Sequence, residues 1–266
     1  MTLQCDAMCN RYTPSDREDP YFKTWLALHP TNYPPPSWRK IGPFGMGAFF
    51  HPTGTGKEVS QSVGQWGLIR PGNPRRWDYG KPRPNAKPGS EPPKRNTNNA
   101  RSETMATLAT YKKAWADGTR CIIPAASFDE PNWESGKNVW WEIKRADGNP
   151  WGIAGLYNEW ADPASGELLP SYTMVTCNAD HHQLMNRMHK PEYDKDGNLL
   201  DPQDKRSIVP LDPADWDAWL FGSKDEAWEL IKLPPVDIYN AGPEETRRLP
   251  VEGSPLRSHE PQCGLF

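Results

Sequence analysis

Apolar and polar side chains mix in short, strand-like runs along much of this sequence. Turn-rich segments separate the runs. Residues 45–69 mix the two kinds of position in the same way and predict short strands, with the tip of a hairpin at residues 54–58. Longer strand-like runs predict strands over residues 120–124, 139–143, 151–157, 172–176 and 206–211.

Helical signals are fewer. Asp19 followed by Pro20 is typical of an N-cap and a first helical position, and predicts a helix that extends to Leu28. Apolar residues at helical spacing predict a second helix over residues 103–116, which Gly118 ends. Shorter helices are expected over residues 180–188 and 212–220, and after the capping-box pattern of Ser223 and Glu226.

The order of these elements shows neither an internal repeat nor a β-α-β rhythm, and residues 71–97 form a loop dense in Pro, Gly, Asn and Lys. The length of 266 residues is sufficient for one sizeable core. We therefore predict a single α+β domain over residues 9–249, with a mainly antiparallel β core and peripheral helices. Residues 250–266 are expected to form a disordered tail.

Composition narrows the class of protein. Hydrophobic residues make up 36% of the chain and 13 residues are Trp, which is too aromatic for a disordered protein. A mean hydropathy of −0.84, with no apolar run of about 20 residues, argues against a membrane protein. We expect a soluble, cytoplasmic protein without a signal peptide. The five scattered cysteines fit neither a disulfide framework nor a zinc ribbon.

The net charge of −3 hides a basic segment. Residues 70–120 contain twelve Lys and Arg against four Asp and Glu, a net charge of +8. With Trp66, Trp77 and Tyr79 interleaved, these cations and rings are what a nucleic-acid groove needs for phosphates and bases. The alternative is a solvated, Pro-rich loop.

Two other patterns suggest different chemistry but fail on spacing. Residues 54–58 (GTGKE) resemble part of a phosphate-binding loop, but they lack the Gly and the Ser or Thr that the motif requires at its ends. Cys177, His181 and His182 suggest a metal site, yet no second pair of ligands lies at zinc-like spacing. We expect neither a metal nor a cofactor.

Four groups of residues, far apart in the sequence, are more informative as an ordered set than singly. They are Met8-Cys9-Asn10-Arg11-Tyr12; Trp66-Gly67-Leu68-Ile69; Asn99 to Thr104 with Arg120 to Pro124 and Phe128-Asp129-Glu130; and Thr176-x-Asn178-Ala179 with His189 and Arg206. Over residues 8–220 this set resembles the SRAP family, the SOS-response-associated peptidases or abasic-site processing proteins.

The resemblance implies a DNA-repair protein that binds single-stranded DNA and traps abasic sites covalently. In that family an N-terminal cysteine is the nucleophile, an asparagine orients it, and a glutamate and a histidine assist. The positions that match are Cys9, Asn99, Glu130 and His189. The residues that match the family's DNA-contacting positions are Arg11, Arg101 and Arg206, which would hold the DNA backbone, and Trp66 and Leu68 on a DNA-facing surface.

An N-terminal cysteine suits this chemistry independently of any resemblance. An abasic sugar opens to an aldehyde. The α-amine of the cysteine, which has a pKa of ~8, forms an imine with that aldehyde. The thiol then adds to the imine and closes a five-membered thiazolidine ring. An internal cysteine cannot do this, because its nitrogen is an amide. A nearby carboxyl group can donate the proton that opens the sugar, and a histidine can shuttle protons.

The sequence departs from the family pattern around the nucleophile. Cys9 directly follows Met8, so residues 1–8 are expected to be an N-terminal extension that is absent from, or removed in, the mature form. If they remain, thiazolidine chemistry is blocked. Cys5 lies in the same extension, but it lacks the Asn-Arg-Tyr context.

Two further departures concern the assisting residues. Family members usually place an arginine two residues after the histidine, whereas here an insert (residues 190–205) separates His189 from Arg206, and His182 is a rival for the histidine. Glu130 is followed by Pro-Asn-Trp instead of an immediate Trp, which affects the expected local geometry.

Each assignment has a structural alternative: an ordinary buried thiol for Cys9, a surface acid for Glu130, a helix-end cap for His189, and ion-pair partners for the arginines. The predicted function is abasic-site cross-linking with associated autoproteolytic, peptidase-type and lyase-type activity, in a monomer. The alternatives are a thiol peptidase that acts on other proteins, and a non-catalytic accessory protein that binds single-stranded DNA.

Overall fold

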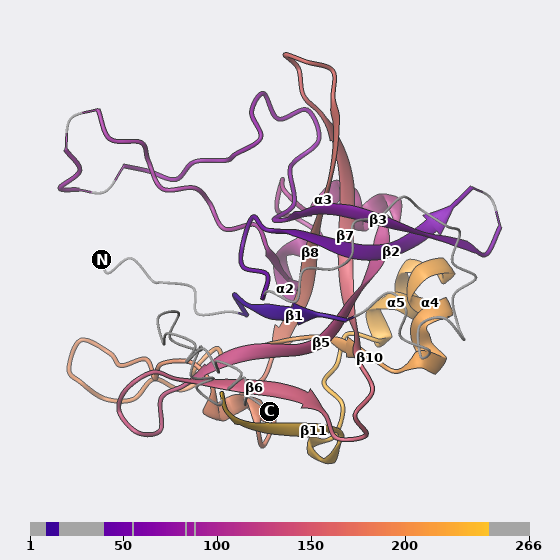
Figure 1. Cartoon of the computed structure of the whole chain (residues 1–266). Coiled ribbons are helices and arrows are strands. Elements are labelled where there is room, and N and C mark those ends of the chain that lie inside the picture. Colours follow the sequence, from indigo (N-terminus) through magenta and orange to yellow (C-terminus); the bar gives the residue numbers. More distant parts are fainter. Residues whose placement is uncertain (1–8, 16–39, 55, 83, 88, 245–266) are drawn as a thin grey trace, which may run out of the picture.

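One mixed sheet of eleven strands organises the computed structural model, which describes residues 9–15, 40–54, 56–82, 84–87 and 89–244 (Figure 1). The strands are β1 (Tyr12–Pro14), β2 (Met46–Thr53), β3 (Glu58–Trp66), β4 (Asn99–Arg101), β5 (Arg120–Asn132), β6 (Val139–Arg145), β7 (Trp151–Ala161), β8 (Leu168–Asn178), β9 (Arg206–Ile208), β10 (Pro210–Leu211) and β11 (Tyr239–Pro243).

Five strands close into a barrel. Their pairing runs β7–β8–β3–β2–β5 and returns from β5 to β7. Because the ring of five strands is closed, none of them is an edge strand of the barrel. Side chains fill the interior of the barrel. The expected mainly antiparallel core is correct only in part, because β3 and β4 both run parallel to β8. The fold is mostly β, with few helices.

Strand β5 links the barrel to the outer sheet. Its first half pairs with β7, from Arg120 to Ala125, and its second half pairs with β6, from Phe128 to Asn132. Strand β1 also lies against β5, with Tyr12 opposite Phe128. Since neighbours cover β5 along its whole length, every residue of it except Ala126 is buried.

The predicted strands are present, but their bounds differ. Strands β5 to β8 each include the predicted run and extend beyond it, whereas the run at residues 206–211 divides into β9 and β10. Residues 45–69 form two long strands that meet at Thr53 and Glu58, which confirms the hairpin tip between them. Three short strands were not predicted: β1, β4 and β11.

The helices are short. They are α2 (Ser102–Met105), α3 (Lys112–Asp117), α4 (Trp216–Phe221) and α5 (Lys224–Glu229), with 3-10 turns η1 (Met185–Arg187), η2 (Pro213–Asp215) and η3 (Val236–Ile238). The helix predicted over residues 103–116 is therefore wrong in its middle, where turns separate α2 from α3. Only a 3-10 turn forms within residues 180–188. The helix predicted at residues 19–28 lies outside the described residues.

Two local signals are confirmed by the backbone. Gly118 caps α3 in the left-handed conformation, with φ of 69°. The Ser223 hydroxyl accepts from the Glu226 amide at the start of α5, while the Glu226 carboxylate accepts from the Ser223 amide. Among the described residues, no helix is long and apolar enough to cross a membrane.

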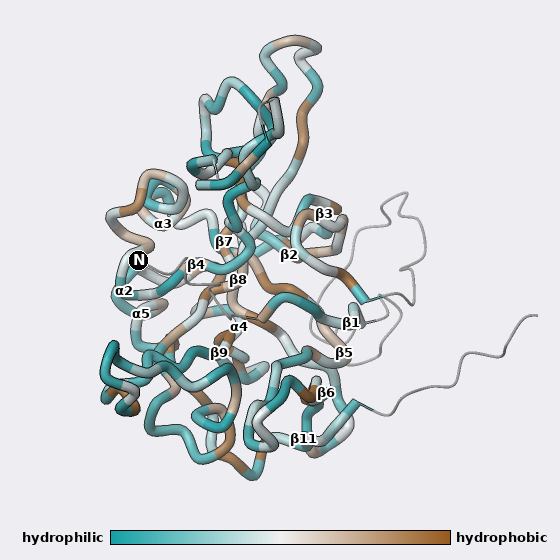
Figure 2. Tube along the Cα trace, turned by 90° about the vertical axis from the view of Figure 1, so that its left-hand side faces the viewer, coloured by the Kyte–Doolittle hydropathy of each residue, from teal (hydrophilic) through white to brown (hydrophobic). Residues whose placement is uncertain are grey.

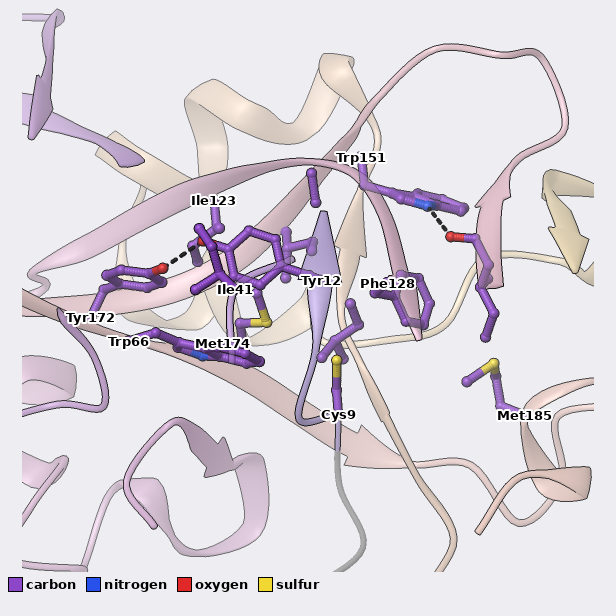
Figure 3. Close-up of a cluster of buried hydrophobic side chains, with 14 of the residues drawn as sticks. Cys9, Tyr12, Ile41, Trp66, Ile123, Phe128, Trp151, Tyr172, Met174 and Met185 are labelled. Carbon is purple, nitrogen blue, oxygen red and sulfur yellow. Dashed lines mark hydrogen bonds between the residues drawn. The ribbon is translucent and has the colours of Figure 1, made fainter. Parts of the chain in front are cut away.

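Tryptophans form much of the core and are anchored by their indole nitrogens. The Trp66 N–H donates to the Asn98 carbonyl at 2.8 Å, and the Trp219 N–H donates to the Cys121 carbonyl at 2.9 Å. Figure 3 shows Trp66 and Trp151 within one buried cluster, which also contains Cys9. Both of these buried indoles satisfy their one polar atom, which is how a Trp ring is accommodated in a core.

The loop at residues 71–97 extends from the barrel beside the tip of the β7–β8 hairpin (Figure 1), and Figure 2 shows it as mainly hydrophilic. The Trp160 indole donates to the Asn73 carbonyl at 2.8 Å, and the Asn158 amide donates to the Ile69 carbonyl at 2.9 Å. These bonds attach the base of the loop to β7.

Candidate active site

Cys9 lies where the chain enters β1, among buried side chains (Figure 3). Its carbonyl accepts hydrogen bonds from two neighbouring amides, Asn99 Nδ2 at 2.7 Å and Asn98 Nδ2 at 3.1 Å. Asn99 belongs to β4, which is held against β8. The predicted pair of Cys9 and Asn99 is therefore brought together across the sheet, and the two amides fix the backbone of Cys9.

Glu130 is on the same side of β5 as Cys9. The antiparallel register of β1 and β5 places the residues before Tyr12 beside those after Phe128. Successive side chains of a strand point to opposite faces, so Asp129 pairs with cations on one side while Glu130 points inward. Glu130 has no exposed surface, and neither carboxyl oxygen has a well-formed hydrogen bond among the described residues.

The position of Glu130 changes its acidity. Burial, and then the charge of Asp129, raise the pKa of the Glu130 carboxyl well above its usual value, while the Cys9 thiol lowers it by a smaller amount. A carboxyl group with a raised pKa stays protonated to a higher pH, which is the state that a general acid needs.

His189 completes the group. Its Nε2 atom lies 3.6 Å from Glu130 Oε2 and donates to the Arg206 carbonyl at 3.0 Å, whereas its Nδ1 atom has no partner among the described residues. Burial lowers the pKa of His189 to about 4. The imidazole is therefore neutral near pH 7, with the proton on Nε2 and a free lone pair on Nδ1.

Two hydrogen bonds hold the backbone of His189. Its φ of 64° is in the left-handed region, which a non-glycine residue adopts only with support. Its N–H donates to the Pro131 carbonyl at 2.6 Å, and its own carbonyl accepts from Lys205 Nζ at 3.0 Å. Lys205 was not predicted to belong to the site; it closes the base of the insert by also donating to the Lys190 carbonyl at 3.4 Å.

The rival histidine lies elsewhere. His182 Nε2 lies 3.0 Å from the Pro234 carbonyl, and its ring packs against Tyr239 at 5.1 Å between centroids. The structure therefore places His189, and not His182, beside Glu130. We call Cys9, Glu130 and His189 the buried triad.

The thiol of Cys9 is protonated in this environment. Burial, and then the charge of Glu130, raise its pKa well above the usual value, and Sγ donates to the Arg11 carbonyl at 3.6 Å. A thiol in this state needs a base before it can attack, because the thiolate is the nucleophile. Glu130 when ionised, or a free α-amine, can take that proton.

Arg11 and Lys40 form an ionic cluster on the outer side of β5. Asp129 accepts from Arg11 Nε at 2.8 Å and from Lys40 Nζ at 2.8 Å, and Glu244 accepts from Arg11 Nη2 at 2.6 Å. The guanidinium also lies 4.4 Å from the ring centroid of Trp140. Because Arg11 is partly exposed, a phosphate can approach it. The phosphate would compete there with the carboxylates of Asp129 and Glu244.

Arg101 and Arg206 share a second ionic cluster. Asp204 bridges them, at 2.9 Å from each guanidinium, and Glu103 accepts two hydrogen bonds from Arg206 Nη1, at 2.6 and 2.7 Å. Arg206 is buried, while the Arg101 side chain is 31% exposed. The two arginines expected to hold DNA are thus close together, and acids neutralise them in this structure.

Two expected DNA contacts are corrected by burial. Trp66 is fully buried in the cluster around Cys9, and Leu68 is 2% exposed in the other core cluster. The indole of Trp66 already donates to a backbone carbonyl. The cluster around Cys9 covers Trp66, and a cluster that includes residues of α2, α3 and α4 covers Leu68. The two side chains therefore present no surface to DNA here, and they are not part of the proposed interface.

The cations of the basic segment do not all lie on one surface. Arg120 is buried and donates to the backbone carbonyls of Trp219 and Gly222. Within the loop at residues 71–97, Arg76 and Lys94 lie 4.5 and 3.8 Å from the ring centroid of Trp77. The cations of the segment are therefore divided between internal hydrogen bonds and the surface of the loop.

Sequence reasoning missed several residues that complete the site. Asn98 stands next to the predicted Asn99, and adjacency was the only signal available for it. Asp129 belongs to the motif around Glu130, but no role was predicted for it. Asp204 and Lys205 had no such signal, because their partners are determined by how the insert folds. Among the residues that the structure describes, no three His, Cys, Asp or Glu side chains are grouped so that they could hold a metal ion.

Comparison with solved structures supports the fold. A protein from Bordetella bronchiseptica is 33% identical with a TM-score of 0.69, over 88% of this chain and 99% of that one. A protein from Bacteroides thetaiotaomicron has a TM-score of 0.60 at 15% identity, over 88% of this chain and 90% of that one, and shares the fold.

Comparison of sequences identifies the family. The chain is 32% identical over 110 residues to the abasic site processing protein HMCES of Xenopus tropicalis, a match that covers 35% of this chain and about a third, 32%, of that protein. Residues 8–247 match the family model described as SOS response associated peptidase (SRAP). This match covers most of the sequence and confirms the predicted resemblance: the chain belongs to the SRAP family.

Proposed function

We propose that this protein binds single-stranded DNA and forms a covalent thiazolidine link with abasic sites through Cys9 as its N-terminal residue. The observation that carries the proposal is that Cys9, Asn99, Glu130 and His189, which come from four separate parts of the chain, meet in one buried site. The name of the Xenopus relative, an abasic site processing protein, points to the same substrate.

The first step opens the substrate. Protonated Glu130 donates a proton to the ring oxygen of the abasic deoxyribose as the bond from C1 to that oxygen breaks. The C1 hydroxyl loses its proton to solvent or to a nearby base, which gives the aldehyde. The α-amine of Cys9 adds to the aldehyde carbon, and loss of water gives an imine. The thiol then adds to the imine carbon while its proton moves to nitrogen, which closes the thiazolidine ring. Atoms balance with one water released.

Asn99 and His189 assist this sequence. Asn99 holds the Cys9 carbonyl, which directs the amine and the thiol toward the same carbon. Neutral His189, with Nε2–H close to Glu130, moves protons between the carboxyl group and the carbinolamine that precedes the imine. The reaction needs the free amine, so residues 1–8 must be absent. Either translation starts at Met8 and that residue is removed, or the Cys9 thiol attacks the carbonyl of Met8 and water hydrolyses the resulting thioester.

DNA binding is assigned to the two ionic clusters and the surface of the basic loop. Arg11, Arg101 and Arg206 lie on elements that also hold the buried triad, so phosphates bound there would flank the reacting sugar. Because carboxylates already pair with these arginines, binding exchanges an internal acid for a phosphate or adds the phosphate to the cluster.

A denaturing gel tests the proposal. A single-stranded oligonucleotide with one abasic site is incubated with protein that begins at Cys9, and a band of lower mobility is expected. Cys9→Ala should abolish this band and leave reversible DNA binding nearly intact, whereas Cys177→Ala, a matched buried cysteine, should keep it.

Other outcomes would favour the alternatives. A band that persists in Cys9→Ala means that another amine traps the aldehyde. DNA binding without any covalent band would favour a non-catalytic binding protein. Cleavage of unrelated proteins by a form that retains residues 1–8 would favour a thiol peptidase.

A further inference from the structure

A pocket of about 230 Å³ lies beside the buried triad, between the insert and the turn that follows β5. The insert supplies one wall, and residues around that turn and η1 supply the other. The residues that line it are Trp133, Glu134, Asn186, Arg187, His189, Pro191, Leu199, Gln203 and Lys205. Since four of them belong to the insert, the pocket depends on the segment that departs from the usual family spacing.

The pocket shares one residue, His189, with the proposed active site. His189 lines it, and the same side chain lies 3.6 Å from Glu130. His189 Nδ1 is buried and has no partner among the described residues. A group bound in this pocket is thus within one side chain of the place where the abasic sugar reacts.

The charged groups of the pocket are already paired. Glu134 accepts two hydrogen bonds from Arg187, at 2.8 and 2.9 Å, and this interaction lowers the pKa of Glu134 to about 2. Lys205 Nζ is directed to the carbonyls of His189 and Lys190. A phosphate here would meet a permanent carboxylate and no free cation of the lining, so an anion is disfavoured.

The apolar part of the lining suits a flat, uncharged ring. Trp133, Pro191 and Leu199 provide it, and Leu199 is 59% exposed although it is apolar. Lys190, which does not line the pocket, has its Nζ over the Trp133 ring, 5.5 Å from the centroid. A base that stacks on that face of the ring would take the place of this flexible cation. Aromatic side chains bind nucleobases of single strands by stacking, with little dependence on sequence.

We propose that this pocket binds the nucleobase next to the abasic site, on one side of the lesion. The inference rests on the proposed function, because it needs single-stranded DNA at the buried triad. Stacking of that base on Trp133 would hold the strand on one side while the arginines hold its phosphates, and would direct the neighbouring, baseless sugar toward Cys9.

Binding to three oligonucleotides tests the inference. The first carries one tetrahydrofuran abasic analogue, which cannot open to an aldehyde; the second and third also lack the base on its 5′ or its 3′ side. Fluorescence anisotropy of the wild-type protein should show that one of the doubly substituted strands binds about fivefold or more weakly than the first. Trp133→Ala and Leu199→Ala should bind all three strands with similar, reduced affinity.

Matched variants control for general effects. Trp228→Ala removes a half-exposed Trp of α5, and Leu200→Ala removes the neighbour of Leu199 that does not line the pocket. Both should discriminate between the strands as the wild type does. Circular dichroism of each variant checks folding, and Leu199→Ala, at an exposed position, serves if Trp133→Ala does not fold.

The results separate this inference from the proposed function. Equal affinity of the wild type for all three strands, or full discrimination by folded Trp133→Ala and Leu199→Ala, would overturn the pocket's role even if natural abasic sites are cross-linked. Absence of both binding and cross-linking would overturn the proposed function, and the inference with it.

Discussion

His189 Nε2 lies 3.6 Å from Glu130 Oε2, and both side chains are almost fully buried. Burial moves the two pKa values in opposite directions: it raises that of Glu130 and lowers that of His189 to about 4. The neutral form of each residue is favoured, so the carboxyl group can hold a proton to give while the imidazole is free of charge. This is the separation of roles that acid–base catalysis requires.

Glu130→Gln should slow cross-linking to abasic DNA by ~10²–10⁴-fold, because the amide cannot donate the proton that opens the sugar. Binding to an intact single strand should change little. Rates are measured by denaturing gel, and affinities by anisotropy. Glu58→Gln, on the exposed hairpin tip, is the control and should behave as the wild type. Equal rates for Glu130→Gln and wild type would return Glu130 to a structural role.

His189 should make stability depend on pH. Its pKa is about 4 in the folded protein and near 6.5 when unfolded, so between these values the unfolded state binds more protons. The free energy of unfolding should therefore rise from pH 4 to pH 6.5, by up to about 3 kcal/mol, and this contribution is lost as pH falls.

This contribution is best measured in Glu130→Gln protein, where the neighbouring carboxyl group no longer titrates. Urea unfolding at several pH values is compared between that variant and the double variant with His189→Asn, since Asn tolerates the left-handed backbone at this position. The double variant should lack the rise. Parallel pH profiles for the two proteins would show that His189 is not held neutral by burial.

The active form should begin at Cys9. Only a free α-amine forms the imine, and Met8-Cys9 is the arrangement from which removal of one methionine leaves it. Intact mass of the protein purified from its natural host should match a chain that starts at Cys9. A mass that includes residues 1–8, together with full cross-linking activity, would contradict the thiazolidine mechanism.

Asp204→Asn should strengthen binding to single-stranded DNA by about two- to fivefold, because the carboxylate that pairs with Arg101 and Arg206 no longer competes with phosphate. The logarithm of the binding constant should also fall more steeply with the logarithm of the salt concentration, by the slope that about one additional phosphate contact adds. Asp196→Asn, in the same insert, is the matched control and should leave both quantities unchanged. Weaker binding by Asp204→Asn would mean that the carboxylate positions the arginines instead of competing.

Local chemistry was readable in the sequence. Gly118 ends α3 because only a residue without Cβ adopts its φ easily, and the Ser223–Glu226 pair begins α5 because both groups lie within one turn. The strand runs of β5 to β8 were found as strand-like runs between turn-rich segments. The cysteine, asparagine, glutamate and histidine of the site were named because they match the family in order and spacing.

The environment of those residues depends on contacts that no local pattern encodes. Cys9 and Asn99 are 90 positions apart and meet only because β1 and β4 join the same sheet. Strands as short as these have no periodicity of their own and form only by pairing. For the same reason Trp66, in a motif expected to face DNA, is fully buried in the cluster around Cys9.

The sequence by itself therefore named the groups that we propose to carry the chemistry, since reactivity belongs to the residue type. Tertiary structure decided which histidine meets Glu130, that acids neutralise Arg101 and Arg206, and that burial shifts the pKa values of the buried triad. Those properties depend on distance and on exclusion of water, and both are set by the packing of segments that are far apart along the chain.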